Sequence, residues 1–229
     1  METHVTYLVR VWLPDRPGAL GLVASRLGAV KGDVIGLEII ERGGGIAVDE
    51  LVVSLPSDVP IDLVAKEVGS VDDVEVEDIR SLDSLTYDPQ IDVVEAAAIL
   101  LGAETRDELS TALIEHVCRT VPSAWACLLT ADGMVLESTG DRPNDQWLTS
   151  FIDGSPTGEP AGEGSTLPLE AIWLPLPAAS LVLVLGGDNV IRAKERQRVA
   201  ALTRVADAWF RRMKERSDLI AMALHPSRG

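Results

Sequence analysis

A turn of four residues, Asp15-Arg16-Pro17-Gly18, joins two segments of different periodicity, and this junction constrains the fold more than any other stretch. Upstream, residues 6–13 are rich in β-branched and aromatic side chains, which predicts a strand. Downstream, apolar residues recur at helical spacing over residues 20–30. We therefore predict that a first strand is followed directly by a first helix.

The turn carries residue types that are typical of a helix start. Asp15 can cap the first turn, and Pro17 suits that turn because its missing N–H has no intrahelical partner. Gly18 leaves backbone N–H groups open at the positive end of the helix dipole, where a small carboxylate could dock. Two interpretations stay open here. One is a capped junction without a ligand, which such signals usually indicate, and the other is an anion-binding helix start.

The pattern of residues 1–82 predicts one α+β domain. Gly43-Gly44-Gly45 separates two strand-like segments, 34–41 and 46–55, the second with an irregularity at Asp49-Glu50, which predicts a hairpin. A second helix opens at Pro60, and a last strand covers residues 74–80. This β-α-β-β-α-β order is the ferredoxin-like plan, an antiparallel sheet with both helices on one face. Its open face and edge would be covered most simply by a second copy.

Residues 9–20, with their Asp-Arg-Pro-Gly-Ala-Leu stretch, and the later Gly32-Asp-Val-Ile35 and glycine hairpin resemble an ACT domain, over residues 6 to about 82. ACT domains are regulatory modules that bind amino acids. The resemblance implies a homodimer whose site lies where the loop after the first strand meets the start of the neighbour's second strand. The implied site residues are Leu13, Pro14, Asp15, Gly18, Ala19 and Leu20 from one copy, with Asp33 and Val34 from the other.

The resemblance also implies roles. The N–H groups of Gly18, Ala19 or Leu20 would hold the ligand α-carboxylate, and Asp15 or Asp33 would hold its ammonium group. Many amino-acid-binding members have Asn at both acidic positions. Because a carboxylate accepts hydrogen bonds but does not donate them, two Asp residues favour neutral or basic amino acids over acidic ones. The structural alternatives are a helix cap for Asp15 and a turn former for Asp33.

The second half of the chain predicts a separate domain. We expect a linker over 83–104 with a short apolar helix, which either connects the domains or pairs with its own copy. Residues 105–216 follow as helix 106–121 capped by Thr105, a type I′ hairpin at Asp132-Gly133, a loop over 154–166, a strand pair over 171–185 and a closing helix over 192–216, with 217–229 as a tail. This order resembles a GAF-like domain, an α/β sandwich with an antiparallel sheet. It implies dimerisation or a second signal.

Composition narrows the function. The formal net charge of −16 argues against nucleic acid and against an anionic membrane surface as partners. The two cysteines, Cys118 and Cys127, lie in apolar elements, so we expect buried free thiols in a reducing compartment. No signal peptide or spanning segment is evident, and we therefore expect a cytoplasmic protein.

Sites of catalysis are not apparent in the sequence. The three histidines have no metal-ligand spacing, and neither a phosphate-binding loop nor a nucleophile elbow occurs. We predict no catalytic residue, no metal and no cofactor. The leading hypothesis is a cytoplasmic, non-enzymatic homodimer that senses a small amino acid. The alternative is a dimeric scaffold for a protein partner, without a small-molecule ligand.

Overall fold

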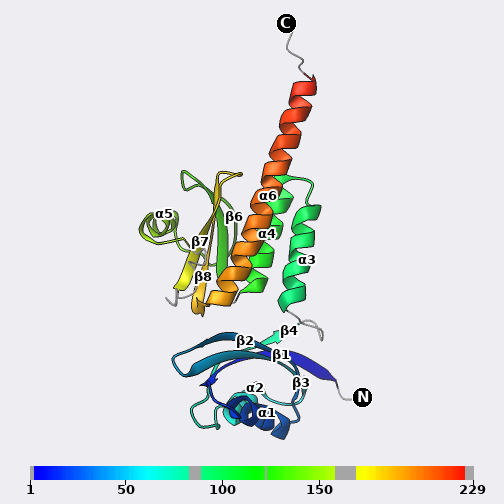
Figure 1. The fold of residues 1–229 in the computed structure, drawn as a ribbon, viewed down its shortest axis with the longest axis vertical. Helices are drawn as coiled ribbons and strands as arrows, with labels where there is room; N and C mark the ends of the chain where they lie inside the picture. The colour runs from blue at the N-terminus through cyan, green and yellow to red at the C-terminus, as the bar shows by residue number, and fades with distance from the viewer. Residues whose placement is uncertain (1–2, 83–88, 122, 158–168, 225–229) are drawn as a thin grey trace. The chain divides into compact units, whose positions relative to one another are not determined.

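A computed structural model describes residues 3–82, 89–121, 123–157 and 169–224 of the chain. It divides into two compact units, residues 1–88 and 89–229, each built on a four-stranded antiparallel sheet (Figure 1). The chain is therefore α+β, as predicted. Residues 83–88 of the predicted linker, 158–166 of the predicted loop and 225–229 of the predicted tail lie outside the described residues.

The first unit has the predicted β-α-β-β-α-β order. Its sheet order is β2-β3-β1-β4, and both helices lie on one face of the sheet (Figure 1). The elements are β1 (His4–Pro14), α1 (Ala19–Ala29), β2 (Asp33–Gly43), β3 (Ile46–Pro56), α2 (Ile61–Val68) and β4 (Glu75–Leu82).

Two periodicities meet in the core of this unit. Alternation along β1 places Val9, Val11 and Leu13 on the helix side of the sheet, where all three are buried. Helical spacing brings Val23 and Leu27 of α1 onto the same cluster, together with apolar residues of α2. β1 and α1, which the Asp15–Gly18 turn connects in sequence, therefore pack against each other in this core.

The glycine hairpin is confirmed, whereas the predicted irregularity in the following strand is wrong. Gly44 and Gly45 have φ of 61° and 84°, the left-handed conformation that a two-residue hairpin turn requires. β3 pairs with β1 without interruption from Ile46 to Pro56. The register shifts lie in β2 instead, near Ile35 and Ile40, because the edge strand accommodates extra residues that an inner strand does not.

The second unit contains four helices and four strands within the described residues. Its sheet order is β6-β5-β8-β7. One face carries α3, α4 and α6, and α5 lies on the other (Figure 1). The elements are α3 (Pro89–Gly102), α4 (Arg106–Thr120), β5 (Trp125–Thr130), β6 (Val135–Gly140), α5 (Asp145–Gly154), β7 (Leu169–Leu176), β8 (Leu181–Ile191) and α6 (Ala193–Leu224).

Three features of this unit differ from the sequence predictions. The short helix expected in the linker is α3, and its Ala96 and Leu100 are buried in the core of the second unit. The closing helix, expected to end at 216, continues to Leu224. The turn after β5 is not type I′, because Gly133 (φ 85°) takes the left-handed conformation without Asp132; its N–H donates to the Thr130 carbonyl at 2.9 Å.

The start of α4 matches its prediction closely. The Glu108 N–H donates to Thr105 Oγ1 at 3.2 Å, and the Glu108 carboxylate accepts from the Thr105 N–H at 3.4 Å. This reciprocal pair is a capping box, which satisfies two N–H groups of the first helical turn.

Candidate functional site

The candidate site is the exposed start of α1, and its geometry differs from the prediction in one respect. The N-cap residue is Gly18, with φ 91° and ψ −17°, and no side chain caps the helix. Asp15 was expected to be the cap, but its Oδ1 lies 3.6 Å from Arg42 Nε and its N–H donates to the Gly45 carbonyl at 2.9 Å. Pro17 precedes the N-cap and so lies outside the first helical turn.

The left-handed turn at Gly18 leaves amide groups open at the helix start. The Ala19 N–H donates to the Arg16 carbonyl at 3.3 Å. Within the described residues, the N–H groups of Leu20 and Gly21 donate to no backbone carbonyl. The space around Gly18 is also open, because a Cβ placed there would meet no atom within 4 Å. A small anion can approach such a helix start and accept from its N–H groups.

Side chains at the predicted site divide into two kinds. Leu13 and Ala19 are buried in the core of the first unit, and the half-buried Leu20 and Val34 pack against the same core. The side chains of Leu13 and Ala19 are therefore largely inaccessible to a ligand. Asp15, Gly18 and Asp33 are exposed and Pro14 is half-buried, so the polar contacts of a ligand would come from the two carboxylates and the helix start.

One chain does not bring the two halves of the predicted site together. Pro14, beside the helix start, pairs with Ile46 at the beginning of β3, whereas Asp33 pairs with Ser54 near its end. At about 3.3 Å per strand residue, these positions are roughly 26 Å apart along the sheet. A site that uses both Asp15 and Asp33 therefore requires two copies of the chain.

A surface cavity that sequence reasoning missed adjoins the end of β1. It has a volume of about 570 Å³, and Leu13 and Pro14 of the predicted site form part of its wall. Trp12 and Asp73 line it as well, and Asp73 has φ 60°, which is uncommon for a residue other than glycine. Nothing in the local sequence pattern indicated that Asp73 lies beside the end of β1.

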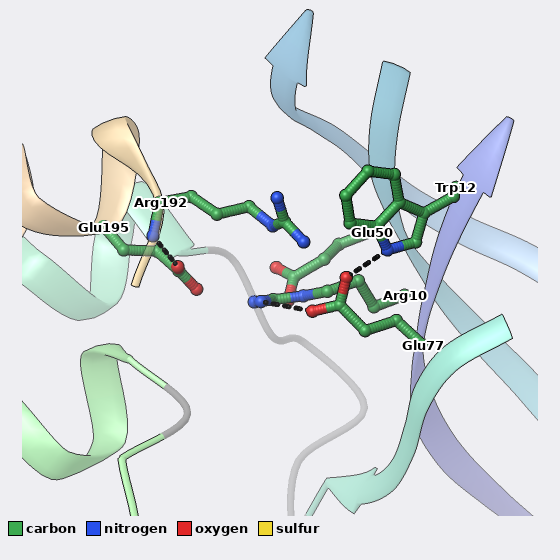
Figure 2. Close-up of polar contacts among 6 residues, drawn as sticks. All are labelled: Arg10, Trp12, Glu50, Glu77, Arg192 and Glu195. Carbon is green, nitrogen blue, oxygen red and sulfur yellow. Dashed lines mark hydrogen bonds and ion pairs between the residues drawn. The ribbon is translucent and has the colours of Figure 1, made fainter. Parts of the chain in front are cut away.

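Charged residues on the other face of the sheet form a network that the sequence did not indicate (Figure 2). Arg10 on β1 donates to Glu50 Oε1 on β3 from Nε at 3.0 Å and from Nη2 at 2.6 Å. Its Nη1 lies 3.6 Å from Glu77 Oε1, and Glu77 also accepts a hydrogen bond from the Trp12 indole. This network orders the polar side of β1 immediately before the candidate site.

Aromatic side chains pack between α5 and the sheet of the second unit. Trp147 contacts Trp125 edge-on with ring centroids 6.1 Å apart, and it stacks on Phe151 at 5.0 Å. Leu148 of α5 is fully buried against the same strands. Trp125 and Trp147 therefore serve the packing of α5 on the sheet.

Burial is the main cause of the pKa shifts of three groups in the second unit, Cys118, Cys127 and His116. Both cysteines are free, and burial raises the pKa of the Cys127 thiol to about 11 and raises that of Cys118 as well. Burial, followed by the charge of Arg119, lowers the pKa of His116. Within the part of the chain that the structure describes, no group of three or more His, Cys, Asp or Glu side chains could hold a metal ion.

A membrane-crossing helix is not found among the described residues, since none of their helices is both long and apolar enough.

Comparison with known proteins gave no family model and no curated protein that matches this chain. Among solved structures, the ACT domain of a GTP pyrophosphokinase from Chlorobium tepidum is 12% identical with a TM-score of 0.28, covering 37% of this chain and 93% of that one. A GAF domain from Pseudomonas syringae pv. tomato is 14% identical with a TM-score of 0.37, covering 58% and 92%. A formyltetrahydrofolate deformylase from Pseudomonas putida is 7% identical with a TM-score of 0.32, covering 91% and 93%.

Proposed function

We propose that this chain is a non-catalytic regulatory protein whose first unit binds a small neutral or basic amino acid at a homodimer interface. In this proposal the second unit serves dimerisation or responds to a second signal. The observation that carries the proposal is the open start of α1, where Gly18 turns left-handed and the N–H groups of Leu20 and Gly21 have no backbone acceptor within the described residues.

The proposed ligand contacts follow from the charges at the two halves of the site. The α-carboxylate accepts hydrogen bonds from the open N–H groups at the positive end of the helix dipole. The ammonium group lies against the exposed carboxylates of Asp15 and of Asp33 from the second copy. Because both residues are acidic, a ligand with a second carboxylate would be repelled.

The proposed dimer is supported by the edge strand β2. Among the residues that the structure describes, this strand has a neighbour on one side only, and Ile35 and Leu37 expose 45% and 48% of their surface along it. Leu22 of α1 is an exposed apolar residue as well. An exposed apolar edge strand tends to pair with another chain, and a second copy at this edge supplies the start of β2 that the site requires.

The site is tested by two substitutions that each remove one carboxylate and by a third that removes only the ion pair of Asp15. Asp15→Ala and Asp33→Ala should each weaken amino-acid binding at least tenfold in calorimetric titrations of the full chain. Arg42→Ala is the matched control, since it removes the ion pair of Asp15 and keeps the carboxylate. Unchanged affinity in both Asp variants would remove the proposed site.

The scaffold remains the alternative function, and two observations favour it. The Asp15 carboxylate already has a cationic neighbour in Arg42, and the Leu13 and Ala19 side chains are committed to the core. A scaffold would show no change in thermal stability with any common amino acid, whereas a ligand at 100 times its dissociation constant adds about 2.7 kcal/mol.

A further inference from the structure

The surface cavity at the end of β1 has chemistry that the proposed amino-acid site does not use. Its volume of about 570 Å³ is in the range of small-molecule sites. Its wall combines one aromatic side chain, two acidic residues and apolar residues, from Trp12, Asp73, Glu75, Pro14, Ile46 and Val74.

Strand pairing places the aromatic ring and one carboxylate on the same face of the sheet. Trp12 lies between Val11 and Leu13, which pack toward the helices, so alternation turns its side chain to the opposite face. Glu75 is the residue opposite Trp12 on β4, and residues directly opposite each other share a face. Because α1 packs on the other face (Figure 1), these two side chains are separated from the α1 start by the sheet.

The indole of Trp12 is held by a neighbouring carboxylate. Its Nε1 donates to Glu77 Oε2, and Glu77 Oε1 lies 3.6 Å from Arg10 Nη1 (Figure 2). The register between β1 and β4 shifts here, which leaves Glu77 as an extra residue between the partners of Arg10 and Val11. One carboxylate therefore contacts both side chains. Trp12 is 36% exposed, so a ligand in the cavity would meet an aromatic ring whose orientation is already fixed.

The two carboxylates of the cavity wall are not neutralised within the part of the chain that the structure describes. Asp73 and Glu75 are exposed, and neither side chain makes a hydrogen bond or an ion pair with another described residue. By contrast, Glu77 on the same strand has Arg10 beside it. Negative charge at the cavity is therefore uncompensated, and it would attract a cation.

The apolar part of the wall favours an organic cation over an inorganic one. Ile46 is 46% exposed, and covering its surface together with that of Trp12 is favourable in water. An alkyl chain would cover both, whereas a metal ion would not. Over residues 3–82, 89–121, 123–157 and 169–224, moreover, no three His, Cys, Asp or Glu side chains gather to hold a metal ion.

We propose that this cavity binds a small organic cation, an alkylamine or an alkylguanidine. Its charged group donates hydrogen bonds to the carboxylates of Asp73 and Glu75, and its alkyl chain lies on the apolar wall. The Trp12 ring adds the attraction of a cation to an aromatic surface. This binding requires neither the α1 start nor a second copy of the chain, so it is independent of the proposed amino-acid site.

Calorimetric titration of the full chain with pentylamine tests the site, with 1-pentanol as a neutral ligand of similar shape. Pentylamine has no carboxylate and therefore cannot use the N–H groups of the α1 start. In about 0.15 M salt, which screens long-range attraction to an acidic chain, pentylamine should bind saturably and 1-pentanol should not. Absence of saturable pentylamine binding, or equal binding of 1-pentanol, would overturn the proposal.

Substitutions of single carboxylates locate the bound amine. Asp73→Asn and Glu75→Gln should each raise the dissociation constant of pentylamine roughly tenfold or more, because each removes a charged acceptor. Asn is also compatible with φ of 60° at position 73. Asp72→Asn is the matched control, since it removes the same charge from an exposed neighbour outside the cavity wall. Equal weakening by Asp72→Asn would indicate general attraction to acidic surface and would overturn the site.

Two further variants separate this cavity from the amino-acid site. Trp12→Leu keeps an apolar side chain and removes the ring, so pentylamine should bind about threefold more weakly and its effect on tryptophan fluorescence should disappear. Asp15→Ala should leave pentylamine binding unchanged, although the proposed function expects it to weaken amino-acid binding. Pentylamine binding that depends on Asp15 and not on Trp12 would overturn the proposal. Because each site is measured with its own ligand, failure of one is distinguishable from failure of the other.

Discussion

Arg10 and Glu50 face each other across β1 and β3, with Arg10 Nη2 2.6 Å from Glu50 Oε1. Both side chains are only 4% exposed. The two inner strands of the sheet are thus joined by an ion pair, which Glu77 extends to the edge strand β4 at 3.6 Å. A buried pair of this kind fixes which residues lie opposite each other, because a shift in register would separate the charges.

Loss of Arg10 should destabilise the first unit strongly. Arg10→Met leaves the Glu50 carboxylate buried without its principal partner, and breaking a buried pair in this way costs about 3–5 kcal/mol. Urea unfolding of the chain measures this loss. The double variant Arg10→Met/Glu50→Met removes both charges and should recover most of the stability. A double variant as unstable as the single one would show that the pair contributes through packing alone.

Two glycine substitutions should have opposite effects. A Cβ at Gly140, where φ is 72°, would lie 2.0 Å from the Ala124 carbonyl oxygen, so Gly140→Ala should destabilise the second unit by several kcal/mol, roughly 3. Gly28→Ala in α1 meets no atom within 4 Å and should stabilise the first unit by about 0.5–1 kcal/mol. Thermal unfolding measures the stability of both variants. A Gly140→Ala chain as stable as the parent would contradict the close approach of the Ala124 carbonyl to Gly140, the last residue of β6.

Stability should fall as His116 becomes protonated. The folded chain holds the pKa of His116 below its ordinary value of 6.5, chiefly through burial and then through Arg119, against opposing effects of Glu115 and Asp92. The unfolded chain therefore binds the proton first, and the contribution of His116 is complete above pH 6.5 and lost as the pH falls below it. His116→Gln should show a flatter decline between pH 7 and pH 5.5 than the parent chain. Identical slopes would exclude His116 as the cause.

The cysteines should react slowly in the folded chain. With the pKa of Cys127 raised to about 11, roughly one thiol in a thousand is ionised at pH 8, and the side chain is fully buried. Iodoacetamide should therefore label Cys127 only after denaturation. Mass spectrometry of the folded and the urea-treated chain measures this difference. Rapid labelling of Cys127 in the folded chain would mean that the structure around β5 unfolds locally and often.

The elements could be predicted where local signals agree. Alternation in β1, helical spacing in α1, the glycine hairpin and the Thr105 cap each involve residues close in sequence, and the structure contains all of them. The predicted cap at Asp15 is wrong because the N-cap residue is Gly18, three positions later, and the Asp15 carboxylate instead lies 3.6 Å from Arg42. The left-handed turn at Gly18 still precedes α1, because glycine adopts this conformation without help from a residue distant in the sequence.

Features that depend on long-range pairing could not be predicted. The partnership of Arg10 and Glu50 follows from the β1–β3 register, which fixes positions 40 residues apart. Likewise, the packing of α3 on α6 depends on tertiary contacts, and the apolar composition of α3 fitted a linker helix as well as a core helix. The distance between Asp15 and Asp33 within one chain became evident only from the strand pairing.

Calorimetric titration of the full chain with a panel of the common amino acids tests the central claim most directly. The account predicts saturable binding of at least one neutral or basic amino acid, one molecule for each helix start, and no binding of aspartate or glutamate. Absence of heat with every amino acid, or binding of an acidic one alone, would contradict it.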